Sequence, residues 1–71
     1  MSMIRLRINN YSCDNNSVRF FDGNDFVIKV PAREGEMLIN MISKYDKIYI
    51  EKRYNGGDWR YYFNNKELDV L

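Results

Sequence analysis

The side chains best suited to acid–base or metal chemistry are scarce in this chain. It contains no histidine, and Cys13 is its only cysteine. Histidine is the usual general base near neutral pH and the commonest metal ligand, and a thiol nucleophile needs a base beside it. We therefore expect Cys13 to be a loop residue without a reactive role. We also expect no zinc site, because a single Cys without His cannot form a zinc cage.

The aspartates and the Gly-Gly pair that could suggest a ligand site are better explained as turn residues. Four aspartates lie next to Asn or Gly, in a spacing that does not match a calcium-binding EF-hand loop: Asp14, Asp22, Asp25 and Asp58. Asp in this setting hydrogen-bonds to the backbone of a turn. Gly56-Gly57 lies between two expected strands, so no helix N-terminus follows it to bind phosphate. The sequence thus predicts a protein that binds a partner without catalysis and without a cofactor.

Arginine and tyrosine residues recur at alternate positions of the expected strands. Alternate side chains of a strand point to the same face of its sheet, so we expect these residues to share one open face. The candidate partner-binding residues are Arg53, Arg60, Tyr49, Tyr62, Arg5, Arg7 and Arg19. Lys29 and Phe21 are expected on the same face, and Glu51 is the only acid expected there.

Two pairs of like charges are expected to face each other across neighbouring strands. Arg19 is expected opposite Lys29, and Arg53 opposite Arg60. Such pairs are mildly destabilising, within the scale of roughly 0.2–1 kcal/mol for cross-strand effects. Either an anionic partner covers the face, or the long basic side chains splay apart in water and protect the sheet from edge pairing. The first alternative predicts a negative partner surface that accepts aromatic rings.

Alternation of apolar and polar residues predicts the strands in the first half of the chain. Met3–Ile8 is an expected strand, and the polar segment Asn9–Ser17 is an expected loop. Val18–Phe21 and Phe26–Val30 are expected to form a hairpin. We expect a three-residue loop, Gly23–Asp25, because that register pairs apolar side chains with each other.

The second half contains the only good helix candidate and a second hairpin. Glu34–Tyr45 carries apolar residues at positions i, i+3, i+4 and i+7, which predicts an amphipathic helix. Lys47–Tyr54 and Trp59–Phe63 are expected strands around the turn Asn55–Asp58.

This order of elements predicts an α+β fold with one domain over residues 1–71. Three strands precede the helix and two follow it, and a turn at Asn64-Asn65 leaves open a short last strand carrying Leu68 and Val70. We expect a small antiparallel sheet of five or six strands with the helix packed on one face. The other face would stay open and carry the basic and aromatic residues.

The charge balance favours a protein over nucleic acid as the partner. A net charge of +1, from 11 basic and 10 acidic residues, weakens the general attraction on which phosphate binding depends. We expect the partner to be an acidic surface of a larger protein or ribonucleoprotein complex. Binding of single-stranded nucleic acid to the arginine–aromatic face and assembly into a small homo-oligomer, which a thin core would favour, are the alternatives.

Localisation is predicted from the cysteine count and from the apolar runs. A lone cysteine fits a reducing compartment, and Met1–Ile8 lacks the apolar core of a secretion signal. No apolar run approaches the roughly 20 residues that cross a bilayer. We expect a cytoplasmic protein without a membrane partner.

The chain is rich in Asn, Tyr, Asp and Lys, most visibly in the segments Asn9-Asn10-Tyr11, Asp14-Asn15-Asn16 and Tyr61-Tyr62-Phe63-Asn64-Asn65-Lys66. In this composition and in its small size the chain resembles the small inhibitors carried by phages and mobile elements, of which anti-CRISPR proteins are the best-known group. Members of this group share no motif, so no residue role is transferred. The resemblance implies stoichiometric binding to a larger bacterial defence complex. The basic face differs from the acidic members that mimic DNA.

Overall fold

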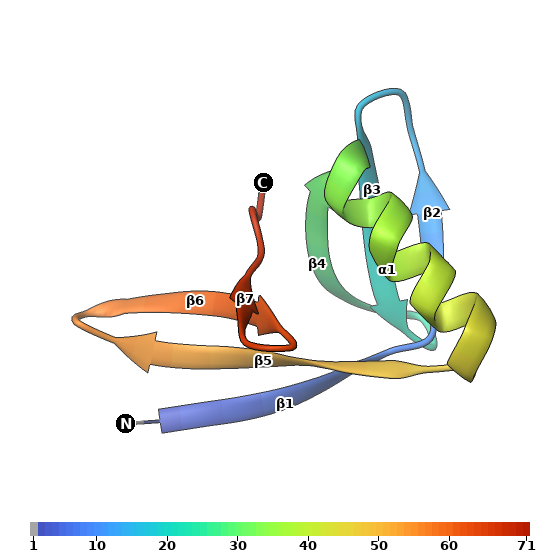
Figure 1. Ribbon diagram of the computed structural model, residues 1–71. Helices are drawn as coiled ribbons and strands as arrows, with labels where there is room; N and C mark the ends of the chain where they lie inside the picture. The colour runs from blue at the N-terminus through green and yellow to red at the C-terminus, as the bar shows by residue number, and fades with distance from the viewer. Residues whose placement is uncertain (1) are drawn as a thin grey trace.

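Seven antiparallel strands in two sheets and a single helix make up residues 2–71, the part of the chain that the computed structural model describes (Figure 1). In the order β1-β5-β6-β7, the strands of the first sheet are Ser2–Ile8, Ile48–Asn55, Asp58–Phe63 and Lys66–Glu67. In the order β2-β3-β4, the strands of the second sheet are Asn10–Cys13, Ser17–Asp22 and Asp25–Pro31. The helix α1, Ala32–Tyr45, lies between β4 and β5 in the sequence. The α+β class is confirmed, and the strands divide between two sheets instead of forming one.

The segment expected to be a loop contains a strand, so that expectation was wrong. Asn10–Cys13 forms β2, which pairs with β3 and places Tyr11 opposite Phe20 and Cys13 opposite Val18. All four residues of β2 are exposed, and the strand lies at the edge of its sheet. No alternation of apolar residues therefore marks β2 in the sequence. Pairing with its neighbour makes this segment a strand.

The β3–β4 hairpin has the predicted apolar pairing but a different turn. Phe20 lies opposite Ile28, as expected. The turn is the two-residue Gly23-Asn24 instead of the three-residue Gly23–Asp25, and the register shifts after Phe20 so that Val27 has no partner. A β-bulge of this kind inserts one extra residue into one strand. The bulge at Val27 keeps Phe20 opposite Ile28, a pairing that a two-residue turn without a bulge would not give.

The β5–β6 hairpin has the predicted register. Arg53 lies opposite Arg60, and Tyr54 lies opposite Trp59. Gly56-Gly57 forms a two-residue turn with φ of 66° and 93°, a left-handed conformation that glycine adopts without steric cost. The side chains of this hairpin therefore point to the faces that the sequence predicted.

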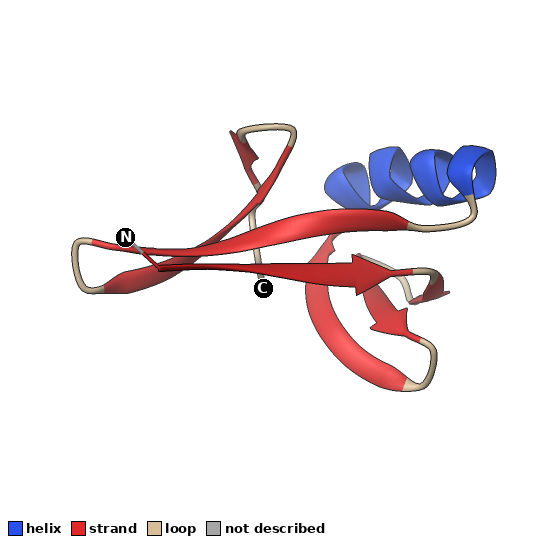
Figure 2. Cartoon of the chain, turned by 90° about the horizontal axis from the view of Figure 1, so that it is seen from below, coloured by secondary structure: helices blue, strands red, loops and turns tan. Residues whose placement is uncertain are grey.

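One core joins the two sheets, the helix and the C-terminal segment. Its buried apolar residues are Ile8, Val18, Phe20, Ile28, Val30, Leu38, Ile42, Ile48, Ile50 and Leu68. The helix contacts β3, β4 and β5, so it covers the junction of the two sheets and leaves much of the first sheet bare (Figure 2). The helix begins at Ala32, two residues earlier than expected, and ends at Tyr45 as expected. Within residues 2–71, no helix is long and apolar enough to span a bilayer.

The helix approaches β3 most closely at Gly35. This glycine is buried, and a Cβ built on it would lie 2.4 Å from Val18 Cγ2 and 2.7 Å from Val18 Cβ. Glycine inside a helix costs about 1 kcal/mol relative to alanine. Gly35 therefore provides space for the packing of α1 on β3, at a cost to the intrinsic stability of the helix.

Replacing Gly35 by alanine is expected to destabilise the protein although alanine is the better helix former. Overpacking a core costs roughly 1–3 kcal/mol, which exceeds the gain of about 1 kcal/mol in helix propensity. Denaturant unfolding followed by circular dichroism measures the net change. Val18→Ala in the same chain removes the Cγ2 methyl group, the nearest atom at 2.4 Å, and leaves Cβ at 2.7 Å, so it relieves part of the clash and the two losses should be less than additive. A Gly35→Ala protein as stable as the wild type would contradict this packing.

The C-terminal segment crosses from the first sheet to the second. The last strand that the sequence left open after Asn64-Asn65 is present as β7, Lys66–Glu67, but it ends before Leu68 and Val70, which were expected to lie in it. The side chain of Leu68 is only 4% exposed and belongs to the core. The backbone N–H of Leu71 donates to the carbonyl of Lys29 on β4, at 2.8 Å. This segment therefore closes the core between the two sheets.

Truncating the two apolar residues of this segment should have unequal effects. Leu68→Ala leaves a cavity in the core and should cost about 2–4 kcal/mol of unfolding free energy. Val70 is 38% exposed, so Val70→Ala should cost well under about 1 kcal/mol. The same denaturant unfolding measures both variants. Similar losses at the two positions would contradict the burial of Leu68.

Candidate binding surface

The first sheet extends past the core as an arm. We define the arm as Ser2–Arg5 of β1, Glu51–Asn55 of β5 and Asp58–Tyr62 of β6. In Figures 1 and 2 the arm projects away from the helix and the second sheet. Both of its faces are consequently accessible, including the face that continues into the core.

The core-side face of the arm carries aromatic residues, although the sequence predicted that the helix would cover this face of the sheet. Tyr54 and Trp59 are 42% and 41% exposed, with ring centroids 5.2 Å apart. The Lys52 ammonium lies 5.1 Å from the ring centroid of Trp59 and 5.5 Å from that of Tyr61. The side-chain alternation was predicted correctly, but the single helix does not reach this far.

The opposite face of the first sheet, here called the outer face, extends from the arm to Arg7 and Tyr49 and holds six of the seven predicted site residues. The pairing of β1 with β5 and of β5 with β6 brings together Arg5, Arg7, Tyr49, Arg53, Arg60 and Tyr62. Arg5 lies opposite Glu51, and Glu51 lies opposite Tyr62. The outer face is therefore a continuous surface across three strands.

Arg19 is not part of the outer face, and its assignment there was wrong. It lies on β3 in the second sheet, opposite Ser12 on one side and Lys29 on the other. Its guanidinium Nη1 contacts Asp14 Oδ2 at 3.4 Å. The alternation of side chains assigns a residue to a face of its own sheet, but it does not show that the strands divide into two sheets.

Arg53 is the most connected side chain of the outer face. Its guanidinium lies 4.2 Å from the ring centroid of Tyr62. Its Nε donates to Glu51 Oε1 at 2.9 Å, and its Nη2 donates to Asn65 Oδ1 at 2.8 Å and also contacts Glu51. The side chain is only 24% exposed. Arg53 is therefore fixed in place and partly neutralised before any partner arrives.

Arg5 is fixed by stacking instead of by an ion pair. Its guanidinium carbon lies 4.5 Å from the ring centroid of Tyr49. Glu51 lies opposite Arg5 in the register, but its carboxylate is bound by Arg53. Every other arginine within residues 2–71 makes an ion pair, so Arg5 is the one guanidinium of this part of the chain left without an acidic neighbour in contact.

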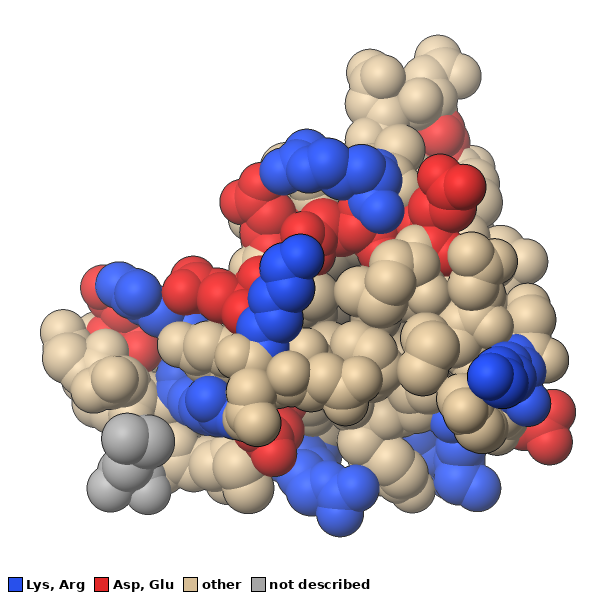
Figure 3. All heavy atoms as spheres, viewed as in Figure 1, with Lys and Arg blue, Asp and Glu red and all other residues tan. Residues whose placement is uncertain are grey.

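The outer face contains more acid than the sequence predicted. Glu67 of β7 lies opposite Tyr62 and contacts Arg60 at 3.6 Å. Asp22 of the second sheet contacts Arg7 at 2.8 Å. The expectation that Glu51 is the only acid here was therefore wrong. Basic and acidic side chains also lie side by side on the part of the surface drawn in Figure 3.

A hollow of about 280 Å³ lies on the outer face. It is lined by Arg5, Tyr49, Glu51, Tyr62, Asn64 and Asn65. The two asparagines form the turn between β6 and β7, with φ of 50° and 64°. The sequence predicted a turn at these residues. It did not show that the turn folds over the outer face, so both asparagines were missed as site residues.

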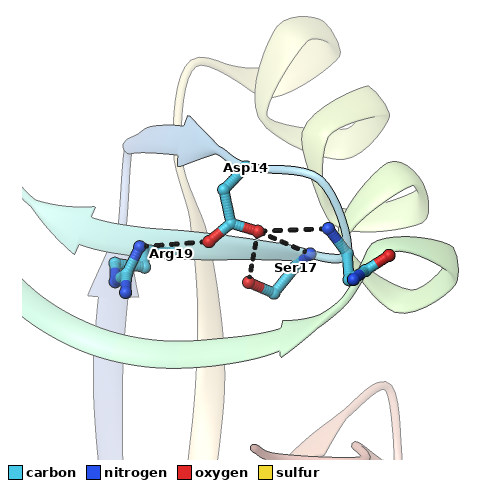
Figure 4. A network of polar contacts seen from close by, with 4 residues as sticks. Asp14, Ser17 and Arg19 are labelled. Atoms are coloured by element: carbon cyan, nitrogen blue, oxygen red, sulfur yellow. Dashed lines mark hydrogen bonds and ion pairs between the residues drawn. The ribbon is translucent and has the colours of Figure 1, made fainter.

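Asp14 organises the turn between β2 and β3 (Figure 4). Its Oδ1 accepts hydrogen bonds from the hydroxyl of Ser17 at 2.8 Å, from the backbone N–H of Ser17 at 3.0 Å and from that of Asn16 at 3.1 Å. The hydrogen bond from the Ser17 hydroxyl, followed by that from the Asn16 backbone, lowers the pKa of Asp14 below its ordinary value of 3.8. Asp14 and Arg19 thus belong to a structural network of the second sheet.

The lowered pKa of Asp14 predicts a loss of stability in acid. In the unfolded chain the pKa of the Asp14 carboxyl returns to its ordinary value of 3.8, so the ionised group stabilises the fold above that pH. This contribution is lost as the pH falls through the lower pKa of the folded state. Asp14→Asn should therefore show a smaller decrease in Tm than the wild type between about pH 5 and pH 2.

Ser17→Ala removes the hydrogen bond with the largest effect on that pKa, and it should reduce the same decrease in Tm. Thermal unfolding by circular dichroism at several pH values measures all three proteins. If the wild type and Asp14→Asn lose the same Tm over this range, the Asp14 network does not contribute to acid stability.

No group of three or more His, Cys, Asp or Glu side chains within residues 2–71 is placed to hold a metal ion. Comparisons with known proteins found no matching family model, no matching curated protein and no matching solved structure. A function for this chain therefore has to be argued from its own surface.

Proposed function

We propose that this chain is a non-catalytic protein-binding module that uses the outer face of the arm and acts as a stoichiometric inhibitor of a larger bacterial protein complex. The observation that carries the proposal is the fixed position of Arg53 and Arg5. Each guanidinium stacks on a tyrosine ring, at 4.2 Å and 4.5 Å from the ring centroid. Arginine and tyrosine are the residue types that contribute most to binding energy in protein interfaces.

Side chains that are already ordered bind at a lower entropic cost. Immobilising a long side chain at an interface costs about 0.5–1.5 kcal/mol. The contacts of Arg53 with Glu51, Asn65 and Tyr62 already restrict it in the free protein. The outer face therefore presents planar groups in defined positions, which favours a partner with an equally defined surface.

The distribution of charge favours a protein partner over a polyanion. Contacts within the chain partly neutralise three of the four arginines on the outer face, namely Arg7, Arg53 and Arg60. Protein interfaces match charges of both signs, whereas nucleic-acid binding depends on a net positive surface that releases counterions from phosphates. The acids of the outer face would repel a phosphate backbone lying across it.

The inhibitory part of the proposal rests on the resemblance to phage and mobile-element inhibitors. A small chain with an ordered, non-catalytic surface can act by occupying a surface that its target needs. A bacterial defence complex with an acidic or mixed surface is the target class that this resemblance suggests. One chain bound per target site is the stoichiometry that follows.

Alanine at both Arg53 and Arg60 should weaken capture of the partner from bacterial lysate at least tenfold, because hot-spot residues typically cost more than about 1 kcal/mol each when truncated. Quantitative mass spectrometry of affinity pull-downs, with nuclease added and omitted, measures the change. Arg19→Ala with Lys29→Ala is the matched control, since it removes the other cross-strand pair of basic residues. Equal capture by both double variants would refute the role of the outer face. Charge reversal of Arg53 is avoided because a glutamate there would lie beside Glu51.

Titration with single-stranded nucleic acid separates a protein partner from the nucleic-acid alternative. If the partner is a protein, short single-stranded RNA and DNA should bind the wild type with dissociation constants weaker than about 10⁻⁴ M at physiological salt, the weak end of non-specific binding. Tighter binding that falls steeply with salt and is lost in the Arg53→Ala, Arg60→Ala protein would replace the protein partner by single-stranded nucleic acid.

A further inference from the structure

We infer that the hollow between Arg5 and the Asn64-Asn65 turn is the anchor site for a carboxylate of the partner, supplied by a glutamate or aspartate side chain. This inference rests on the proposed function, since it names the group of the partner that the outer face recognises. It depends on three features of the hollow: an arginine without an acidic contact, an acid that is already neutralised, and an amide with a defined orientation.

Arg5 provides the positive charge. It lines the hollow, and it makes no ion pair with any residue in 2–71, unlike the arginines at positions 7, 19, 33, 53 and 60. Its guanidinium carbon lies over the ring of Tyr49, 4.5 Å from the centroid, and this cation–π contact restricts the side chain without using its N–H donors. A guanidinium held in this way can donate two parallel hydrogen bonds to one carboxylate.

Glu51 lines the same hollow but makes no ion pair with Arg5. Its Oε1 accepts from Arg53 Nε at 2.9 Å and contacts Arg53 Nη2. Arg53 therefore removes most of the repulsion that Glu51 would exert on an incoming anion. A partner carboxylate that bound Arg53 would have to break the ion pair between Glu51 and Arg53. A partner carboxylate that binds Arg5 leaves that ion pair intact.

The same arginine determines the orientation of the Asn65 amide. Arg53 Nη2 donates to Asn65 Oδ1 at 2.8 Å. A guanidinium has no acceptor, so the oxygen of the amide has to face Arg53. The amide nitrogen of Asn65, with its two donors, is then left for a ligand. Arg5 and Asn65 therefore both offer N–H donors suited to a carboxylate in the hollow.

The size and charge of the hollow select one side chain of a partner. Its volume of about 280 Å³ is below the range of roughly 300–1,000 Å³ that is typical of small-molecule sites. A carboxylate carries one negative charge, which matches the single charge of Arg5. A phosphomonoester carries about −1.5 to −2 at neutral pH and would leave an excess of charge beside Glu51.

Titration of the isotopically labelled full chain with the peptide acetyl-Gly-Glu-Gly-amide tests this site by NMR. We expect a dissociation constant on the order of 1 mM, with the largest shifts at the side-chain amide of Asn65 and at Nε of Arg5. The matched peptide acetyl-Gly-Gln-Gly-amide should bind at least tenfold more weakly, because it has the same shape without the charge. Equal binding of the two peptides would overturn the inference.

Variants of the chain locate the binding. Arg5→Gln should weaken the glutamate peptide at least tenfold, and Asn65→Ala should weaken it by a smaller factor. Arg19→Gln is the matched control, because it removes a cation of the second sheet that does not line the hollow, and it should bind the peptide like the wild type. Unchanged binding by Arg5→Gln, or an equal loss in Arg19→Gln, would place the peptide elsewhere and overturn the inference.

A phosphate ligand is separated from a carboxylate by two further probes. Inorganic phosphate or a dinucleotide that shifts the Asn65 amide at lower concentration than the glutamate peptide would overturn the carboxylate assignment.

Failure of this inference is also distinct from failure of the proposed function. Partner capture that is lost in Arg53→Ala, Arg60→Ala while no peptide binds at Arg5 would overturn only the anchor site. Peptide binding with unchanged capture in that double variant would support the anchor site and overturn the proposed use of the outer face.

Discussion

A single helix of fourteen residues has to cover two sheets, and this constraint determines the rest of the structure. The helix reaches both sheets only because Gly35 lets it lie directly on Val18. From there it covers the ends of the first sheet around Ile48 and Ile50. The rest of that sheet extends past the core as the arm. A chain of this length does not contain enough apolar residues to bury two full sheets, so exposure of the arm follows from the size of the chain.

An arm without a core beneath it has to be stabilised by contacts between neighbouring side chains of the same face. On the outer face these are the stacks of Arg5 and Arg53 on tyrosine and the ion pairs with Glu51 and Glu67. The facing pair of Arg53 and Arg60 is accommodated because each contacts a different acid. The like-charge pair therefore needs no external anion to be tolerated, which weakens one reason for expecting a polyanionic partner. The same contacts fix the side chains that a protein partner would meet.

Local side-chain alternation was sufficient to predict the faces of the long strands and the pairing of Arg53 with Arg60, because period-two patterns identify the buried side of a strand. The single helix was predicted from its own apolar periodicity. The division into two sheets was not predictable in this way, so Arg19 was grouped with residues of another sheet. β2 was missed because a fully exposed edge strand has no apolar pattern. Glu67 was missed as an acid of the outer face because its position depends on a turn folding over that face. Residues adjacent in a strand were thus predictable, whereas residues brought together by the tertiary fold were not.

The spacing of charges on the outer face bears directly on the choice of partner. Neighbouring strands lie about 4.8 Å apart, which is shorter than the Debye length of about 8 Å at physiological ionic strength. Each acid of the outer face therefore acts on any ligand bound at the adjacent arginine without much screening. A phosphate chain running across the strands from Arg5 would pass Glu51, Tyr62 and Glu67 in that order. A protein surface can place one carboxylate at Arg5 and neutral or basic groups beside those acids, so it is the partner that this pattern of charges favours.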